Sequence, residues 1–426
     1  MTNRITRRDF LAMAAAAAAG GLAGCGGEDS CATGPDGKLV CALPQPTETP
    51  FDTVVVLMMA SRSFDHLMGW LPGANGRQAG QRYTDASGAL QDTWPLAPDM
   101  QGCRYADPGH TWQDMAVHYA DGRCDGFLKT AKAGDTYPIG YYTGADLPVT
   151  SVLAQAYTTF DNYHASMLGD AWSNRLYQLT GTTQLGMSPV FFSDPNAQRP
   201  CTIETAVFDR VLAAGLSTAY YSFGEPMTGL FRSRKYDAVS RPIERFFDDA
   251  AKGALPNVVF VDPDNTAAAK SGGTANDDHH PGSVLAAEAF IGKVYNALKD
   301  SLQWGRMVFV LNFDQGGGFY DHVAPPACQD DTVLAGAGPF PDLKRLGFRV
   351  PCIAMGPYAP KKVESGGPYE HCSVLRMIEW RWNLPPLTTR DRTAKNLADA
   401  LDFKIQRPAI VVPAYSPPPA AACPAA

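Results

Sequence analysis

The sequence lacks several features that point to particular classes of protein. It has 36 lysine and arginine residues against 43 aspartate and glutamate residues, a net charge of −7, and no basic run after its first turn. This excess of acid argues against a nucleic-acid partner. It contains no Cys-x-x-Cys pair, so a zinc site of the usual spacing is not expected. It also contains no internal repeat.

The first 25 residues carry an export pattern. An Arg-Arg pair at 7–8 precedes the alanine-rich apolar segment 11–24, which is typical of twin-arginine signals. That segment is shorter than the about 20 residues that span a bilayer. Leu22-Ala23-Gly24-Cys25 resembles a bacterial lipoprotein cleavage site. We expect loss of residues 1–24 and lipidation of Cys25. The alternative is an ordinary signal peptide with a chance cysteine.

Removal of that segment would change the net charge from −7 to −9, because it takes three arginines and one aspartate. An acidic body does not adhere to anionic lipid, so any membrane attachment would depend on the lipid at Cys25. The pattern predicts a periplasmic or cell-envelope lipoprotein exported by the twin-arginine route.

The remaining chain divides into three parts by composition. Residues 25–50, rich in Gly and Pro, indicate a linker, and residues 51–405 carry the patterned apolar segments of a folded domain. Residues 406–426, rich in Pro and Ala, predict an unstructured tail.

Nine cysteines follow Cys25. In an oxidising compartment Cys31 could pair with Cys41, and Cys103 with Cys124, because each pair is close in sequence. Connectivity stays open, and an odd number leaves at least one thiol unpaired within the chain.

Four apolar runs predict the central sheet: residues 53–59, 257–261, 307–313 and 351–355. Runs without polar alternation belong to strands buried on both faces, as in parallel sheets covered by helices. We predict an α/β three-layer sandwich with a mostly parallel central sheet. Around it we expect a strand at 215–223, helices at 112–120 and 284–302, and a lid or helix pair at 231–247.

Two of these runs end in polar loops with a recognisable pattern. The first continues as Ala60-Ser61-Arg62-Ser63-Phe64-Asp65-His66, and the third as Asp314-Gln315-Gly316-Gly317-Gly318-Phe319-Tyr320-Asp321-His322-Val323. They resemble the bacterial phosphoesterase family that includes non-specific phospholipases C and some acid phosphatases. The family forms are Glu-Asn-Arg-Ser-Phe-Asp-His and Asp-Glu-His-Gly-Gly-Phe-Tyr-Asp-His-Val. The resemblance implies an alkaline-phosphatase-like fold, hydrolysis of phosphoric esters and a divalent metal.

A third segment, Leu168 to Arg175, is similar to the family's Gly-Pro-Thr-x-Pro-Asn-Arg. The family's Thr or Ser there is the nucleophile, at a helix N-terminus where free N–H groups stabilise phosphate oxygens. The matching residue is Ala171, and a methyl group cannot attack phosphorus.

Five positions on three loops therefore lack the family's group, namely Ala60, Ser61, Ala171, Gln315 and Gly316. The family's metal positions correspond to Ala60, Ser61, Asp314 and Gln315. Loss of two carboxylates should lower affinity for a hard cation steeply, so we expect weak or absent metal binding.

A second set of family positions is retained: His110, His279, Asp321, His322 and His371. The resemblance implies that they line the site and bind an anion. The structural alternative is that they serve packing, with Asp321 and His322 as a hydrogen-bonded pair and His110 as the cap of the helix at 112–120.

Three hypotheses remain. The chain is an exported phosphoesterase-family protein that has lost or altered hydrolysis and binds a phosphoester, another anionic small molecule or a lipid. Alternatively it is an active hydrolase with a rearranged site, in which Ser173, Ser61 or Ser63 is the nucleophile and histidines replace the metal. The third hypothesis is a purely structural lipoprotein.

Overall fold

The computed structural model describes residues 31–33, 39–41, 43–185, 198–335, 339, 341–420 and 422–423. The predicted signal segment and Cys25 lie outside these residues. Within the described ranges, no helix combines the length and apolarity that crossing a bilayer requires.

The centre of the protein is an eight-stranded sheet with the strand order β11-β10-β12-β3-β13-β14-β8-β15. Its strands are β3 (Thr53–Met59), β8 (Thr158–Phe160), β10 (Thr218–Ser222), β11 (Ser240–Pro242), β12 (Val258–Val261), β13 (Met307–Phe313), β14 (Cys352–Met355) and β15 (Lys362–Glu364). Within this sheet β14 alone runs against the others.

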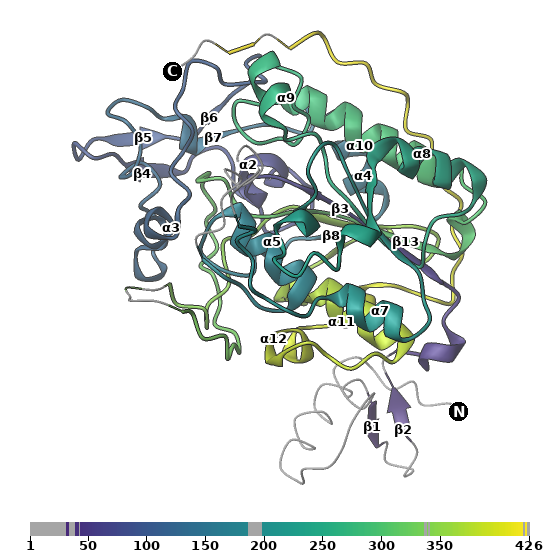
Figure 1. Ribbon diagram of the computed structural model, residues 1–426. Helices are drawn as coiled ribbons and strands as arrows, with labels where there is room; N and C mark the ends of the chain where they lie inside the picture. Colours follow the sequence, from purple (N-terminus) through teal and green to yellow (C-terminus); the bar gives the residue numbers. More distant parts are fainter. Residues whose placement is uncertain are drawn as a thin grey trace, which may run out of the picture.

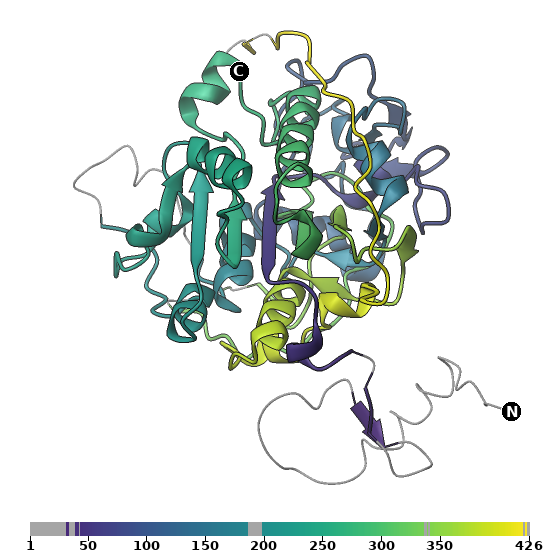
Figure 2. The same ribbon diagram turned by 90° about the vertical axis from the view of Figure 1, so that its right-hand side faces the viewer.

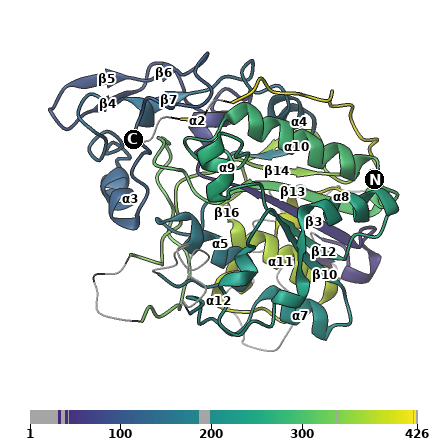
Figure 3. The same cartoon turned by 45° about the horizontal axis from the view of Figure 1, so that its top comes forward.

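The four predicted runs are β12, β3, β13 and β14, which are neighbours in the sheet (Figure 3). Every residue of β3 and β13 is buried, as expected of strands covered on both faces. The prediction of a mostly parallel central sheet is confirmed.

Helices cover both faces of the sheet (Figure 1). One layer contains α4 (Thr150–Ala156), α8 (Ile243–Lys252), α9 (Ala267–Gly272) and α10 (Val284–Lys299); the other contains α5 (Ala171–Thr180), α7 (Val207–Ala213), α11 (His371–Trp382) and α12 (Thr389–Thr393). Together with the sheet they form the predicted three-layer α/β sandwich.

Smaller elements lie around this core. They are α2 (Phe64–Met68) and α3 (Trp112–Tyr119), and the strand pairs β1 (Cys31–Thr33) with β2 (Leu39–Cys41), β4 (Arg82–Thr84) with β5 (Leu90–Asp92), β6 (Trp94–Pro95) with β7 (Gly140–Tyr141), and β9 (Tyr163–His164) with β16 (Tyr369–Glu370). Short 3₁₀ turns are Pro46–Glu48, Ala120–Gly122, Tyr137–Ile139, Met227–Leu230, Asp237–Val239, Trp304–Arg306 and Leu397–Ala400.

The expected lid or helix pair at 231–247 is wrong. This segment contributes the edge strand β11 and the start of α8. β11 is short, only partly buried and ends in Pro242, and a proline is tolerated at the edge of a sheet. Such a strand carries little apolar pattern for sequence analysis to detect.

No described residue of the predicted tail lies in a helix or strand, but contacts hold part of it along the outside of α10 (Figure 2). Tyr295 Oη donates to the carbonyl of Ile410 at 3.0 Å, and Asn296 Nδ2 donates to the carbonyl of Val412 at 3.3 Å. A disulfide then joins Cys423 to Cys103.

This disulfide excludes the expected pairing of Cys103 with Cys124, which is free and buried. The backbone register of β1 and β2 places Cys31 opposite Cys41. Their side chains lie outside what the structure describes, so that pairing stays a prediction.

Candidate active site

The loops after β3 and β13 meet at the carboxyl edge of the sheet. The strands are parallel neighbours in which Phe313 pairs with Met59, and the N–H of Asp314 donates to the carbonyl of Met59 at 3.1 Å. The next residues on both loops are therefore adjacent. We call Ala60, Ser61, Asp314, Gln315 and Gly316 the substituted cluster.

Both carboxylate oxygens of Asp314 accept hydrogen bonds inside the protein. The N–H of Ser61 donates to Oδ1 at 2.9 Å, and Arg175 Nε donates to Oδ2 at 2.9 Å. Burial raises the pKa of Asp314, and Arg175 opposes this shift. Arg175 also donates from Nη1 to Asp262 Oδ1 at 2.7 Å, so one guanidinium joins the ends of β12 and β13.

Ser61 and Gln315 close the loop between the two strands. Ser61 adopts a left-handed backbone with φ of 61°, and Gln315 Nε2 donates to its Oγ at 2.9 Å. The amide oxygen of Gln315 accepts from the N–H of Gly317 at 2.5 Å. A Cβ at Gly317 would lie 2.0 Å from the carbonyl oxygen of Ser61, so the loop needs glycine there.

The donor set of the substituted cluster does not fit the divalent metal that the resemblance implies. Hard cations take six or more oxygen ligands, carboxylates above all. Here Asp314 supplies the single carboxylate, and its oxygens already accept from N–H groups. Ala60 and Gly316 offer no side-chain donor atom. We therefore derive no chemical step through a metal at this position.

Ala171 is the first residue of α5, so it occupies the predicted helix N-terminus. Arg175, one turn later on the same face, reaches Asp314, which places the start of α5 near the substituted cluster. Asp170 caps the helix by accepting from the N–H of Ser173 at 2.9 Å. The position contains a methyl group where the family has a hydroxyl.

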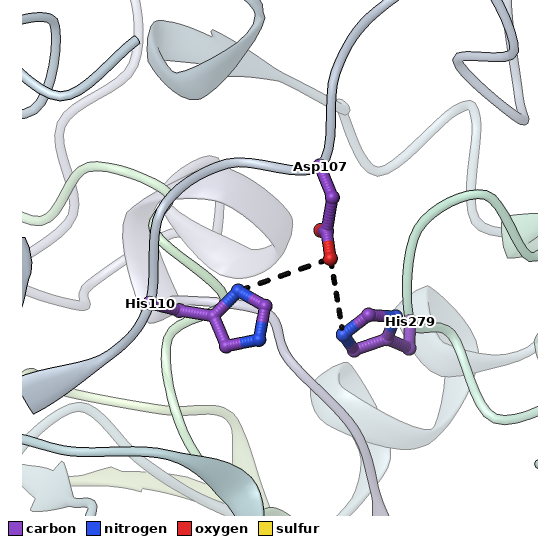
Figure 4. Close-up of side chains that lie close together, drawn as sticks. All are labelled: Asp107, His110 and His279. Atoms are coloured by element: carbon purple, nitrogen blue, oxygen red, sulfur yellow. Dashed lines mark ion pairs between the residues drawn. The ribbon is translucent and has the colours of Figure 1, made fainter. Parts of the chain in front are cut away.

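A second group, which we call the histidine cluster, consists of Asp107, His110, His279 and His280. The Asp107 carboxylate lies 3.7 Å from His279 Nε2, 3.8 Å from His280 Nδ1 and 4.0 Å from His110 Nδ1. Figure 4 shows the rings of His110 and His279 next to each other beside this carboxylate. Burial, with Lys270 and His110, holds the pKa of His279 well below its usual range.

His110 does not cap α3, so that structural alternative is wrong. The cap is Thr111, whose side chain accepts from the N–H of Asp114. His110 Nδ1 donates instead to the carbonyl of Pro108 at 2.7 Å, and its ring turns toward His279.

Asp321 and His322 belong to a separate buried network around Arg349. Arg349 pairs with Asp321 from Nε at 2.9 Å and with Asp65 from Nη2 at 3.0 Å. His322 Nδ1 bonds Asp65 Oδ2 at 2.5 Å. The expected hydrogen bond between Asp321 and His322 is therefore wrong. His322 is hydrogen-bonded to Asp65, and Asp321 is paired with Arg349.

His371 is hydrogen-bonded to the backbone of the substituted cluster. Its Nε2 donates to the backbone carbonyl of Asp314 at 2.9 Å, and its Nδ1 accepts from Tyr163 Oη at 3.2 Å. Burial lowers the pKa of His371 to about 4, so the ring is neutral near pH 7. It orients the backbone of Asp314.

Comparison with known proteins identifies the family of this chain. A model described as the phosphoesterase family matches residues 51–385. The chain belongs to this family. Non-specific phospholipase C6 of Arabidopsis thaliana is 30% identical over 389 residues, covering 83% of this chain and 72% of the plant protein. Phospholipase C A of Mycobacterium tuberculosis is 27% identical, covering 83% of this chain and 78% of that protein.

Among solved structures, a protein in the alkaline phosphatase superfamily from Vibrio parahaemolyticus matches with a TM-score of 0.40 and 10% identity. The match covers 83% of this chain and 71% of the other.

Several residues of this phosphoesterase-family site were not singled out from the sequence. They are Asp65, Asp107, Arg175, Asp262 and Arg349. Arg175 stood in the family-like Asn-Arg pair and Asp65 in the Phe-Asp-His segment, so a signal existed for both. Asp262 and Arg349 carry no local signal of their partners, because these contacts join distant segments. Asp107 lies three residues before His110, but its contacts with His279 and His280 also join distant segments.

Proposed function

We propose that this protein is an exported member of the phosphoesterase family that binds a phosphoester or another anionic small molecule or lipid. In this proposal, hydrolysis by the family's reaction is lost or altered. The observation that carries it is that both oxygens of the Asp314 carboxylate accept hydrogen bonds within the protein, from Ser61 and Arg175.

Phosphoester hydrolysis of the family type needs a nucleophile and a cation that holds the phosphate in register. Ala171 removes the nucleophile, and loss of a nucleophile alone can cost about 10⁴ to 10⁶ in rate. Ala60 and Gln315 remove charged oxygen ligands at the same time, and Ser61 replaces a neutral amide ligand. Since such groups act as a unit, their joint loss supports a protein that binds without efficient turnover.

The alternative is an active phosphoric ester hydrolase with another nucleophile. Two of its three serines are already committed as donors: Ser173 Oγ to Asp170 Oδ2 at 3.0 Å, and Ser63 Oγ to the carbonyl of Tyr320 at 2.5 Å. Ser61 Oγ accepts a bond from Gln315, so its hydroxyl proton is free to be removed. Its position beside Asp314 favours Ser61 in this alternative.

The location proposed for the protein is the periplasm or cell envelope, with a lipid anchor at Cys25. The disulfide between Cys103 and Cys423 supports an oxidising compartment. Cys25→Ser should move the protein from the membrane fraction to the soluble fraction. Unchanged membrane association of Cys25→Ser would refute the anchor.

The binding and turnover parts of the proposal can be measured together. A phosphomonoester and a phosphodiester are titrated into the purified chain by calorimetry, and product release is followed in the same samples. Saturable binding with little product supports the proposal. Rapid product release, or no binding of either ester, refutes it.

A further inference from the structure

Two of the imidazole nitrogens that face the Asp107 carboxylate have no proton to give it. His279 Nδ1 lies 2.6 Å from the carbonyl of His280, and His280 Nε2 lies 3.0 Å from the carbonyl of Gly102. A carbonyl accepts, so these two nitrogens carry the ring protons. The nitrogens facing Asp107, His279 Nε2 and His280 Nδ1, are then lone-pair acceptors.

The same logic applies to His110. Its Nδ1 donates to the carbonyl of Pro108, which leaves Nε2 as the free nitrogen. His110 and His279 pack edge to face with ring centroids 5.3 Å apart, and Figure 4 places both rings beside the Asp107 carboxylate. A carboxylate and several acceptor nitrogens thus lie together, and the nearby proton of His110 Nδ1 goes to the carbonyl of Pro108 instead.

His280 provides an independent observation. Its side chain is 6% exposed, and its Nδ1 has no hydrogen-bond partner, although a buried polar nitrogen without a partner is costly. This nitrogen lies 3.8 Å from Asp107 Oδ1, too far for a hydrogen bond. Within the described residues no hydrogen bond reaches the Asp107 carboxylate either.

We propose that Asp107, His110 and His279 bind a divalent transition metal of the zinc class, with His280 beside them. Imidazole and carboxylate ligands suit zinc, which binds four ligands at about 2.0–2.2 Å in a tetrahedron. In such a tetrahedron neighbouring ligand atoms are about 3.3 Å apart, so the 3.7 Å separation of Asp107 Oδ2 from His279 Nε2 needs only a small contraction.

The backbone carbonyls at Pro108, His280 and Gly102 complete the pattern of a metal site. Histidines that bind metals usually donate their other ring nitrogen to a carbonyl or carboxylate, which fixes the tautomer and the ring orientation. All three histidines of this cluster do so. His66 and His164 also donate to backbone carbonyls. What distinguishes this cluster is that the remaining nitrogens of His279 and His280 face a carboxylate.

The neighbouring cations do not replace such a metal. Lys270 Nζ pairs with Asp277 at 3.5 Å, and Arg62 Nε pairs with Asp278 at 3.4 Å. The other group of suitable ligands, Asp65, Asp321 and His322, differs in this respect. Arg349 already contacts both of its carboxylates, so that group has its cation within the chain.

The site is open to solvent on the side of Asp107, whose side chain is 43% exposed; those of His110 and His279 are 23% and 17% exposed. A metal can therefore enter, and a phosphoester oxygen could approach it. The proposed metal site can bind its ion whether or not the protein hydrolyses phosphoesters.

The test is a titration of the purified, metal-stripped chain with Co²⁺, read by visible absorption, followed by competition with Zn²⁺. We expect one equivalent of cobalt to give d–d bands without the near-ultraviolet band of a cobalt thiolate. Zinc should displace it with a dissociation constant of about 1 µM or tighter. His110→Ala and His279→Ala should each weaken binding by more than about 100-fold.

The matched control is Asp121→Asn, which removes an exposed carboxylate outside the cluster and should leave cobalt binding unchanged. His110→Ala, at a partly exposed position, keeps the test valid if His279→Ala fails to fold. Absence of d–d bands, or bands unaffected by His110→Ala, would overturn the metal site. Because the readout is absorption rather than hydrolysis, its failure is distinct from failure of the proposed function.

Discussion

Arg175 Nε donates a hydrogen bond to Oδ2 of Asp314 across 2.9 Å, and both side chains are buried. The two residues are 139 positions apart. Their contact holds the N-terminal turn of α5 against the carboxyl ends of β12 and β13. Asp314 is the one family ligand position that still has a carboxylate. Its charge is paired with the guanidinium of Arg175.

We predict that Arg175→Ala destabilises the protein by about 3–5 kcal/mol, because it leaves the buried charges of Asp314 and Asp262 uncompensated. Urea unfolding followed by circular dichroism measures this. The control is Arg82→Ala, since Arg82 and Asp92 form an ion pair with side chains 66% and 65% exposed. It should cost less than about 1 kcal/mol. Equal effects of the two substitutions would contradict the structural role of Arg175.

Restoring the family's residues should raise phosphoester hydrolysis only when several of them are restored together. Ala171→Thr alone should recover little hydrolysis, because the new hydroxyl has no metal to lower its pKa. Ala60→Glu, Ser61→Asn and Gln315→Glu together should restore metal binding. Turnover should then rise by about 10³ or more when Ala171→Thr is added. Asparagine suits the positive φ of Ser61, since it readily adopts the left-handed region.

Phosphodiester turnover and magnesium titration of all three variants check this prediction. The buried position of Ala60 makes Glu a tight fit that could cost about 1–3 kcal/mol, so thermal unfolding is measured alongside. Full recovery by Ala171→Thr alone would show that the other positions do not matter.

The pH dependence of stability should carry a signature of His118. Burial lowers the pKa of His118 to about 4, below its value of about 6.5 in the unfolded chain. The unfolded state therefore binds more protons between these values. The stabilising contribution of neutral His118 to the folded state is complete above pH 6.5 and is lost as pH falls toward 4.

His118→Phe keeps a ring beside Phe127, whose centroid lies 4.9 Å away, and removes the titration. From pH 7.5 to 4.5 the wild-type chain should lose about 2–3 kcal/mol more stability than the variant. Urea midpoints at the two pH values measure the difference. Parallel losses in both proteins would contradict the pKa shift.

The Cys103–Cys423 disulfide should stabilise the fold by fixing the C-terminal tail. Cys423→Ser should lower stability by about 2–4 kcal/mol and expose the segment after Ile410 to proteolysis. The matched control is Cys328→Ser, at a partly buried free thiol, which should change stability by less than about 1 kcal/mol. Equal protease resistance of the two variants would show that the tail is held without the disulfide.

The sheet was predictable because β3 and β13 are almost entirely apolar, with Thr53 and Asn312 as the exceptions. A strand covered on both faces shows that pattern. Strand β11 was not predictable, because a three-residue edge strand is too short to show an apolar pattern in the sequence. The contact of Cys103 with Cys423 spans 320 residues, and no local pattern indicates such a partner.

The substituted cluster was predictable for a similar reason. Ser61 and Asp314 follow parallel strands, whose carboxyl ends meet at one edge. The partners of these residues were not predictable: Arg175 comes from a helix, and Asp107 from an irregular loop. The sequence indicated His279 by resemblance, but only the folded chain shows the carboxylate of Asp107 beside it.

The central claim, that the family's hydrolysis is lost or altered here, is tested most directly by the turnover of the unmodified chain. Phosphomonoester and phosphodiester hydrolysis are measured on metal-stripped and magnesium-loaded samples, with Asp314→Ala as the reference. The account predicts little turnover, no stimulation by magnesium and no difference from Asp314→Ala. Robust magnesium-dependent turnover that Asp314→Ala abolishes would contradict it.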